Sequence, residues 1–336
     1  MKKVLFAIAS FFIGVALFVW VSKNIGWYEI KKALLIFTGW QGIAIFVLTA
    51  LIEVIGSLRW KLILKGLGVK ASFRELFRYY LAGSSFAYFF PMLVIGDEVF
   101  MTHMLKEKKA VPWPKGMASA VIDRILELTA NLVVIFFGIM FFFLTIGFLQ
   151  AKIRLVYIVA FIFVVIAVIF LYFKSFKNES IVRYFMQNEK EQLLEVEKEA
   201  FGFLKPKNNT MWEGLGLSFL RAGIIIFRAW LLIVFLGKTI SILPALSVLG
   251  FSYLALLLPI PASLGSHEAV QTFAFDALNL GAGTGMVYVM VIRGAEVVLY
   301  LAGLIIFIRL SLNLLKTNII KKMEDFINKT KSITQS

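Results

Sequence analysis

The chain of 336 residues contains no cysteine and only two histidines, His103 and His267. The absence of cysteine excludes disulfide bonds, thiolate catalysis and zinc or iron–sulfur sites held by cysteine. Two histidines are too few for the usual histidine-built metal site. The glycine-rich Walker pattern that binds nucleotide phosphates is missing as well. We therefore expect no metal, no other cofactor and no ATP hydrolysis.

Charged residues are also scarce. They make up 16% of the chain, whereas hydrophobic residues make up 60%. Soluble domains are about 25% charged and about 45–50% apolar, so this composition indicates a protein that crosses a membrane several times. A net charge of +15 would suggest nucleic acid as the partner of a soluble protein. Here the lysines cluster in short segments between apolar runs, which is the positive-inside pattern, and no nucleic-acid partner is expected.

Apolar runs of about 20 residues can cross a hydrocarbon core of about 30 Å. They predict transmembrane helices at about 4–21, 39–58, 118–147, 154–173, 213–236 and 285–310. The run at 4–21 resembles a signal peptide, but it is too long and has no small-residue cleavage site before Lys23, so we expect it to be retained. Two further apolar stretches, at about 74–105 and 243–281, are interrupted by proline and glycine.

Each interrupted stretch carries proline, glycine and a carboxylate where an apolar helix needs none of them. The first contains Pro91-Met-Leu-Val-Ile-Gly96-Asp97-Glu98, and the second contains Pro259-Ile-Pro261-Ala-Ser-Leu-Gly265-Ser-His-Glu268. Unsatisfied backbone groups and charges in hydrocarbon are costly. We therefore interpret these motifs as functional breaks in the helices, at Pro91, Gly96, Pro259, Pro261 and Gly265.

The two motifs belong to an internal repeat. Four pairs of residues keep a separation of 169 or 170 positions: Pro91 and Pro261, Glu98 and Glu268, Arg124 and Arg293, and Arg59 and Arg228. The basic residues then predict how the interrupted stretches sit in the membrane. Lysine and arginine flank 74–105 on both sides, whereas almost none flank 243–281. Under the positive-inside rule, both ends of the first stretch are cytoplasmic and both ends of the second are outside.

These observations predict an all-α polytopic integral membrane protein. It has about six transmembrane helices plus two re-entrant helical hairpins in an inverted-topology repeat; eight plain spans with proline kinks are the alternative. The single membrane domain, residues 1–336, divides into a first inverted repeat (1–150), a second (151–312) and a basic cytoplasmic tail (313–336). The second repeat includes an amphipathic cytoplasmic linker helix at 178–204. Both termini are expected in the cytoplasm. Inverted repeats are typical of secondary transporters, which bind substrate near the bilayer midplane.

Ionisable residues inside the apolar stretches are candidates for substrate binding, because the fold would be more stable without them. A half-helix is expected to return after each break, with Asp97 as the candidate cap in the first stretch or Ser266 in the second. The positive end of the helix dipole at such a start suits an anion. Glu98 and Glu268 lie in the first turn of these half-helices. They are expected either to contact substrate or to complete the caps.

Two arginine–glutamate pairs, Arg124 with Glu127 and Arg293 with Glu296, have i, i+3 spacing. Each pair therefore shares a helix face and is able to form an ion pair. A guanidinium offers a fixed fork that matches a phosphodiester, so we expect these residues to bind an anionic lipid headgroup. Salt bridges that hold the two halves together are the alternative.

Other charged residues are placed less centrally. Arg59 and Arg221 are close enough to the ends of predicted helices for their head groups to reach the membrane surface. Glu53 and Arg228 lie within apolar runs.

Several motifs together carry a family resemblance: Arg59-Trp60, Pro91 with Gly96-Asp97, Asp123-Arg124, Pro259-x-Pro261 with Gly265-x-x-Glu268, and Arg293. In this order and spacing, over about residues 4–312, they resemble the flippase-like membrane domain of lysylphosphatidylglycerol synthases. Two departures leave the headgroup preference open. Val99, Phe100 and Met101 stand where an arginine is expected, and Ala262-Ser263 stand where paired glycines are common.

The resemblance implies a flippase or scramblase in the bacterial or archaeal cytoplasmic membrane that moves a phospholipid or a polyprenyl-linked lipid between leaflets. The chain ends at Ser336 without the aminoacyltransferase domain of the multiple peptide resistance factors, so lysyl-lipid synthesis is not expected, and the protein is not predicted to be an enzyme. One alternative is a membrane enzyme that acts on a lipid-linked substrate with Asp97 and Glu98 as acid and base. Another is a scaffold that docks a lipid-modifying partner through 178–204. The expected partners are membrane lipids, and the sequence leaves homo-oligomerisation open.

Overall fold

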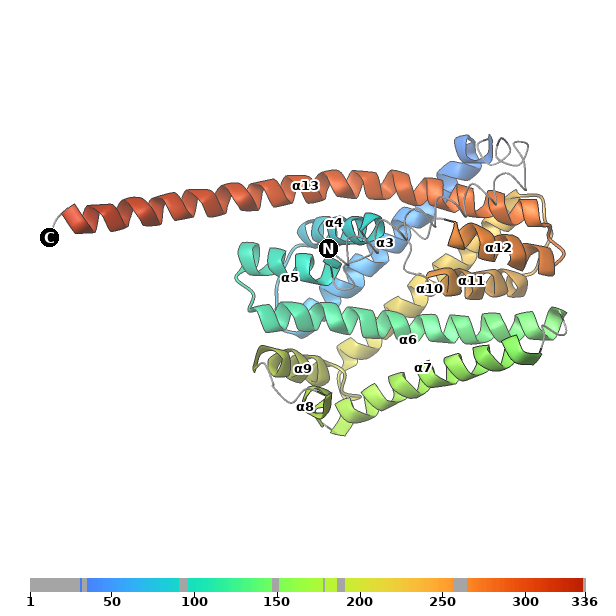
Figure 1. Cartoon of the computed structure of the whole chain (residues 1–336), viewed down its shortest axis with the longest axis horizontal. Coiled ribbons are helices and arrows are strands. Elements are labelled where there is room, and N and C mark those ends of the chain that lie inside the picture. Colours follow the sequence, from blue (N-terminus) through green and yellow to red (C-terminus); the bar gives the residue numbers. More distant parts are fainter. Residues whose placement is uncertain are drawn as a thin grey trace.

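The computed structural model describes residues 31, 35–90, 96–146, 151–177, 179–185, 191–256 and 265–334, and all regular structure in these ranges is helical (Figure 1). The helices are α3 (Trp40–Gly66), α4 (Phe73–Phe89), α5 (Gly96–Lys109), α6 (Trp113–Ile146), α7 (Ala151–Lys177), α8 (Ile181–Phe185), α9 (Glu191–Phe203), α10 (Asn209–Phe235), α11 (Ile242–Leu256), α12 (Ser266–Ala277) and α13 (Ala282–Thr334).

Four segments of these helices are long and apolar enough to cross a membrane: Trp40–Gly66, Trp113–Phe142, Asn209–Phe235 and Ala282–Leu314. They coincide with four of the predicted transmembrane helices, and the prediction of an all-helical polytopic membrane protein is confirmed. The predicted helix at 154–173 lies within α7. The predicted helix at 4–21 lies outside the described residues. Because α13 is one helix from Ala282 to Thr334, it continues through the predicted start of the tail at 313.

The interrupted stretches form two helical hairpins, α4 with α5 and α11 with α12, and in each hairpin the two helices pack against each other. Ser72 caps α4 by accepting the backbone N–H of Glu75, which is the usual role of serine before a first turn. At the same end of the hairpin, Lys109 Nζ lies 2.8 Å from Glu75 Oε2. This ion pair joins the start of α4 to the end of α5.

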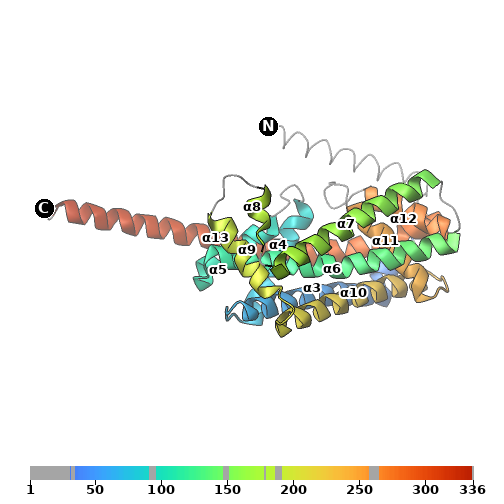
Figure 2. The same ribbon diagram turned by 90° about the horizontal axis from the view of Figure 1, so that it is seen from below.

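The helices recur at a constant interval along the chain. α3 and α10 begin at positions 40 and 209, α4 and α11 at 73 and 242, and α6 and α13 at 113 and 282, so the interval is identical in all three pairs. Their packing recurs too. α4 packs on α13 as α11 packs on α6, and α5 packs on α6 as α12 packs on α13. α3 and α10, which are equivalent to each other, lie side by side (Figure 2).

Equivalent helices run in opposite directions. In Figure 1, α6 runs from left to right and α13 from right to left. The α4–α5 hairpin lies towards the left end of these long helices, and the α11–α12 hairpin lies towards the right end. The charged residues that were singled out in the sequence therefore come from helices that enter the same bundle from opposite ends.

Close helix packing depends on glycine at the contacts of the hairpins with α6 and α13. A Cβ atom at Gly138 of α6 would lie 2.4 Å from the backbone oxygen of Leu246 in α11. At Gly303 of α13, it would lie 2.8 Å from the backbone oxygen of Leu81 in α4. Membrane helices associate largely through such van der Waals packing, because lipid tails remove most of the hydrophobic driving force.

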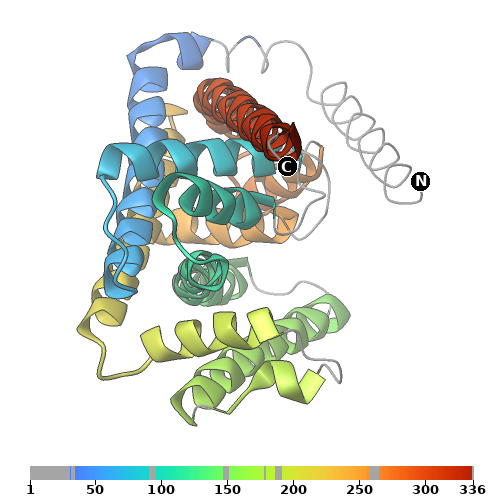
Figure 3. The ribbon, with the colours of Figure 1, turned by 90° about the vertical axis from the view of Figure 1, so that its left-hand side faces the viewer.

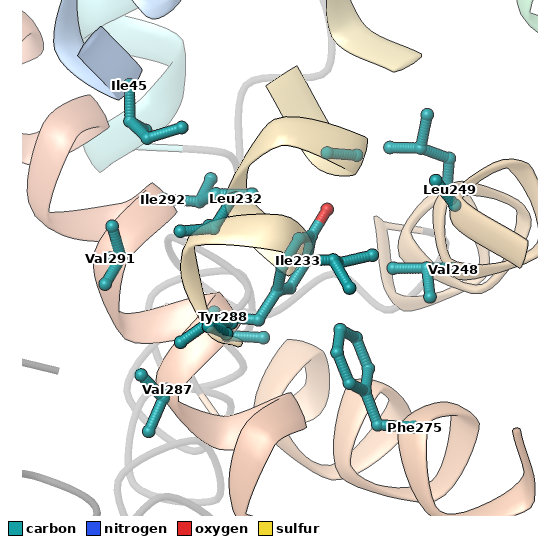
Figure 4. Packing of buried hydrophobic residues seen from close by; sticks show 14 of the residues in the cluster. Ile45, Leu232, Ile233, Val248, Leu249, Phe275, Val287, Tyr288, Val291 and Ile292 are labelled. Atoms are coloured by element: carbon teal, nitrogen blue, oxygen red, sulfur yellow. The ribbon is translucent and has the colours of Figure 1, made fainter. Parts of the chain in front are cut away.

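The largest apolar cluster joins α3 to α10, α11, α12 and α13. In Figure 4, Ile233 of α10 lies beside Tyr288 of α13, and Phe275 of α12 packs below them. The rings of Phe275 and Tyr288 are 5.1 Å apart between centroids. This cluster holds the second hairpin against the central α3–α10 pair.

The predicted single helix at 178–204 is not what the structure shows. α8 and α9 fold back on each other, because Glu197 Oε1 of α9 accepts the backbone N–H groups of Ile181 and Val182 at the start of α8, at 2.6 and 3.0 Å. Residues 16 apart in one continuous helix would be about 24 Å apart. The amphipathic prediction holds for α9, which buries Val196 and Ala200 against α6. Figure 3 shows α7, α8 and α9 on the side of α6 away from α13.

Candidate functional site

At the contact between α3 and α10, each helix carries a buried arginine that donates a hydrogen bond to the other helix. Arg59 of α3 donates from Nη1 to Ser218 Oγ of α10, at 3.1 Å. Arg228 of α10 donates from Nη1 to Thr49 Oγ1 of α3, at 2.9 Å. The interval between the two donors in the chain is the same as that between the two acceptors. The repeat therefore extends from the helices to individual hydrogen bonds.

Each of these arginines also contacts a glutamate on the long helix of its own repeat. Arg59 Nη2 lies 3.0 Å from Glu127 Oε2 of α6, and Arg228 Nη2 lies 3.4 Å from Glu296 Oε1 of α13. Glu127 and Glu296 are separated by the same interval as the arginines. Both glutamates that were predicted as site residues therefore contact an arginine from a neighbouring helix.

A second duplicated contact joins each hairpin to a long helix. Arg124 Nε of α6 donates to Glu98 Oε1 of α5 at 2.5 Å, and Arg124 Nη2 binds Asp97 Oδ2. In the other half, Arg293 Nη1 of α13 lies 3.0 Å from Glu268 Oε1 of α12. Carboxylates at a helix start are favoured by the helix dipole, and guanidinium–carboxylate bonds are strong because both partners are charged.

Arg124 and Glu127 of the first long helix, whose spacing allows an ion pair, take other partners instead. Arg124 binds the hairpin carboxylates Asp97 and Glu98, and Glu127 binds Arg59 and Arg221. Spacing of i, i+3 places two side chains on one helix face, but it does not decide which partner each one takes. Two carboxylates presented together by α5 satisfy the fork of Arg124 better than one carboxylate on its own helix.

The predicted cap of α12 by Ser266 is wrong. α12 begins at Ser266, and the residue before it is Gly265, whose positive φ of 80° suits glycine. Glu268 Oε2 accepts the backbone N–H of Gly265 at 2.8 Å, while its other oxygen faces Arg293. Glu268 therefore completes the helix start and binds an arginine at once. Asp97 lies inside α5 and binds Arg124.

The predicted breaks are described only in part. Gly96 is the first residue of α5, and Gly265 directly precedes α12. Pro91, Pro259 and Pro261 lie outside the described residues.

The prediction that the head group of Arg59 reaches the membrane surface is wrong, because the side chain is buried. The residue is 1% exposed, and its Nε and Nη2 atoms bind the two oxygens of Asp123 at 2.6 and 2.7 Å. Arg221 is also directed inward. Its Nη1 binds Glu127 Oε1 and its Nη2 lies 3.5 Å from Glu53 Oε1. The sequence contained one indication that Arg59 has a partner in the bundle. Ser218 and Thr49 keep the same interval in the chain as the arginines that they bind.

A cavity of about 250 Å³ lies among α3, α4, α5, α6, α10 and α13. Five carboxylates line it: Glu53, Asp97, Glu98, Asp123 and Glu127. The guanidinium groups of Arg124 and Arg221 line it as well. The Arg124 side chain is 52% exposed, whereas those of Asp97 and Glu98 are 9% and 7% exposed. Arg124 is therefore the cation of this cavity most accessible to an incoming anion.

The equivalent region of the second half is less charged. Arg228, Arg293, Glu268 and Glu296 have direct counterparts, but Asp123 corresponds to Ile292 at the same interval. His267 Nε2 is buried there without a hydrogen-bond partner among the described residues. Across those residues, no group of three or more His, Cys, Asp or Glu side chains is placed to hold a metal ion.

The fold and these buried charges define a multi-pass helical membrane protein with a duplicated polar centre. Residues 7–303 match the family described as the lysylphosphatidylglycerol synthase TM region, and the chain belongs to that family, as its motifs predict. A UPF0104 membrane protein of Methanocaldococcus jannaschii is 28% identical over 293 residues, which cover 83% of this chain and 86% of that protein. No solved structure matches the chain.

Proposed function

We propose that this protein is a flippase- or scramblase-type transporter. It moves a phospholipid or a polyprenyl-linked lipid between the leaflets of a bacterial or archaeal cytoplasmic membrane. The observation that carries the proposal is the cavity around Arg124, where charged side chains line a space inside an otherwise apolar bundle. A charged headgroup meets a large barrier in hydrocarbon, and a polar cavity lowers that barrier while the acyl chains stay in lipid.

The exposed surface of the long helices supports a mechanism in which the headgroup enters the cavity and the acyl chains stay in lipid. Large apolar side chains are exposed on α6, including Val133, Phe136 and Phe137, and on α13, including Val298 and Ile305. Such a surface suits contact with lipid tails. Family membership supports a function related to membrane lipids.

In the proposed mechanism, α4–α5 and α11–α12 are re-entrant hairpins that open towards opposite faces of the membrane, with both termini in the cytoplasm. Arg124 and Arg293 alternate in holding the headgroup phosphate as one repeat moves against the other. Their equivalent positions in the two repeats and their matching contacts to Glu98 and Glu268 support equivalent roles. Alternation between two related sites is typical of transporters with inverted repeats.

The proposal includes no chemical reaction. Asp97 and Glu98 were the candidates for acid and base, and both bind the guanidinium of Arg124. The contact therefore favours a role in positioning Arg124.

Leaflet exchange in proteoliposomes tests the proposal. Purified protein is reconstituted with fluorescent phospholipids, and an impermeant reductant bleaches the dye in the outer leaflet. Bleaching well beyond the outer-leaflet half is expected, and Arg124→Gln should reduce its rate strongly. Arg74→Gln is the matched control, because Arg74 is exposed at the start of α4. Bleaching that stops at half, for phospholipids and polyprenyl-linked lipids alike, would contradict the proposal.

A further inference from the structure

Glu53 lies in the middle of α3 and is 3% exposed. Its Oε1 atom accepts a hydrogen bond from the Tyr300 hydroxyl at 3.2 Å and lies 3.5 Å from Arg221 Nη2. Its Oε2 atom is buried and has no hydrogen-bond partner among the described residues. One oxygen of a buried carboxyl group that lines the cavity is therefore unsatisfied.

Among the carboxylates around the cavity, Glu53 has the longest contact with a cation. Arg59 is bound by Asp123 and Glu127, and Arg124 is bound by Asp97 and Glu98. Arg221 makes its close contact with Glu127 and its long contact with Glu53.

Counted formally, five carboxylates meet three guanidinium groups in this cluster. A buried carboxylate without a close cation is costly, and uptake of a proton removes that cost.

The groups that face Glu53 come from every helix packed around it: Arg221 from α10, Glu127 from α6, Tyr300 from α13 and Tyr80 from α4. Asp97, Glu98, Asp123 and Arg124 line the rest of the same cavity. Two of these groups, Glu127 and Arg221, already bind each other. The surroundings therefore offer Glu53 the hydroxyl groups of Tyr300 and Ser84 and one distant cation.

We propose that Glu53 is a proton-binding site, loaded from the cavity, and that this proton is coupled to the lipid movement proposed above. Oε2 takes up a proton, so that the carboxylate becomes a neutral carboxylic acid. The neutral acid no longer attracts Arg221 Nη2, which is then released towards the cavity that it lines. Proton binding thereby adds a cationic donor for a headgroup phosphate, and loss of the proton withdraws that donor.

A proton fits this position better than a metal ion. Glu53 presents a single unpartnered oxygen, whereas sodium-like or divalent cations need several oxygen ligands. Within the described ranges, no cluster of three or more potential metal ligands is present.

Infrared spectroscopy tests proton binding without any transport. The full chain in lipid is titrated with acid and base, and the C=O stretch of protonated carboxylic acids is followed. Glu53→Gln should remove one carboxylic acid signal from the titration, whereas Glu107→Gln should leave that signal, because Glu107 is exposed on α5. An unchanged titration in Glu53→Gln overturns the proposal. Glutamine is a neutral isostere of the protonated acid, so failure of Glu53→Gln to fold also contradicts it.

Coupling depends on the proposed transport and is measured separately. A pH gradient is imposed across the proteoliposomes of the leaflet exchange experiment. With one proton per lipid, each pH unit should shift the equilibrium distribution of lipid between leaflets by about tenfold. Glu53→Gln should lose this shift, whereas Glu107→Gln should keep it.

The two proposals fail in different ways. Absence of exchange in the wild-type protein contradicts the transport function, and the infrared titration still decides whether Glu53 binds a proton. Exchange that ignores the gradient overturns the coupling while the transport function stands.

Discussion

Arg59 Nη1 donates a 3.1 Å hydrogen bond to Ser218 Oγ, across the contact between α3 and α10. The same bond recurs from Arg228 to Thr49 in the opposite direction. Each helix of this pair therefore donates one arginine hydrogen bond and accepts the equivalent bond from the other helix.

Arg59→Ala should destabilise the fold more than any other single arginine substitution in this cluster. It leaves Asp123 buried without its cation, and breaking a buried pair in this way costs about 3–5 kcal/mol. Thermal unfolding in detergent measures the loss, with Arg74→Ala as the exposed control. Arg59→Ala combined with Asp123→Ala should recover part of the stability. Equal unfolding temperatures for Arg59→Ala and the control would contradict this account.

Arg124→Lys should fold normally but exchange lipid poorly. Lysine keeps the positive charge that Asp97 and Glu98 require, but it lacks the planar fork that binds both carboxylates and, in the proposed mechanism, also holds a phosphate. Arg124→Ala should lose stability as well, because both carboxylates are then left unpaired. Comparing unfolding temperatures with leaflet exchange rates separates the two effects. Full exchange in Arg124→Lys would show that only charge matters at this position.

Gly138→Ala should destabilise the protein although alanine favours helix. Its Cβ would lie 2.4 Å from the backbone oxygen of Leu246, so α11 must move away from α6. Overpacking of this kind costs about 1–3 kcal/mol. Gly223→Ala is the matched control, because nothing lies within 4 Å of a Cβ at that position, and it should be neutral or slightly stabilising. The prediction fails when both variants unfold at the same temperature.

Glu197→Ala should release α8 from α9 without affecting leaflet exchange. Its carboxylate accepts the backbone N–H groups that begin α8, and these lose their acceptors in the variant. Hydrogen exchange at Ile181 and Val182 measures the release, with Glu195→Ala, an exposed residue of α9, as control. Loss of function with intact membrane helices would instead favour a scaffold that acts through this segment.

Much of the architecture follows from local features of the chain. The apolar runs mark the membrane helices, and the constant separation of Arg59 from Arg228 marks the duplication. The family follows from the same motifs. Helix starts were harder to predict, because Gly265 with its positive φ, rather than a hydroxyl side chain, precedes α12.

The partners of the buried charges could not be read from the chain. Arg59 and Asp123 are 64 positions apart, and Tyr300 and Glu53 are 247 apart. Such contacts depend on which helix faces meet, and on where the two hairpins enter the bundle. Composition and spacing were sufficient for the membrane class and the family. Packing alone turned Arg59 and Arg221 inward and left Glu53 short of a cation, because a buried charge takes whichever partner the neighbouring helices bring within reach.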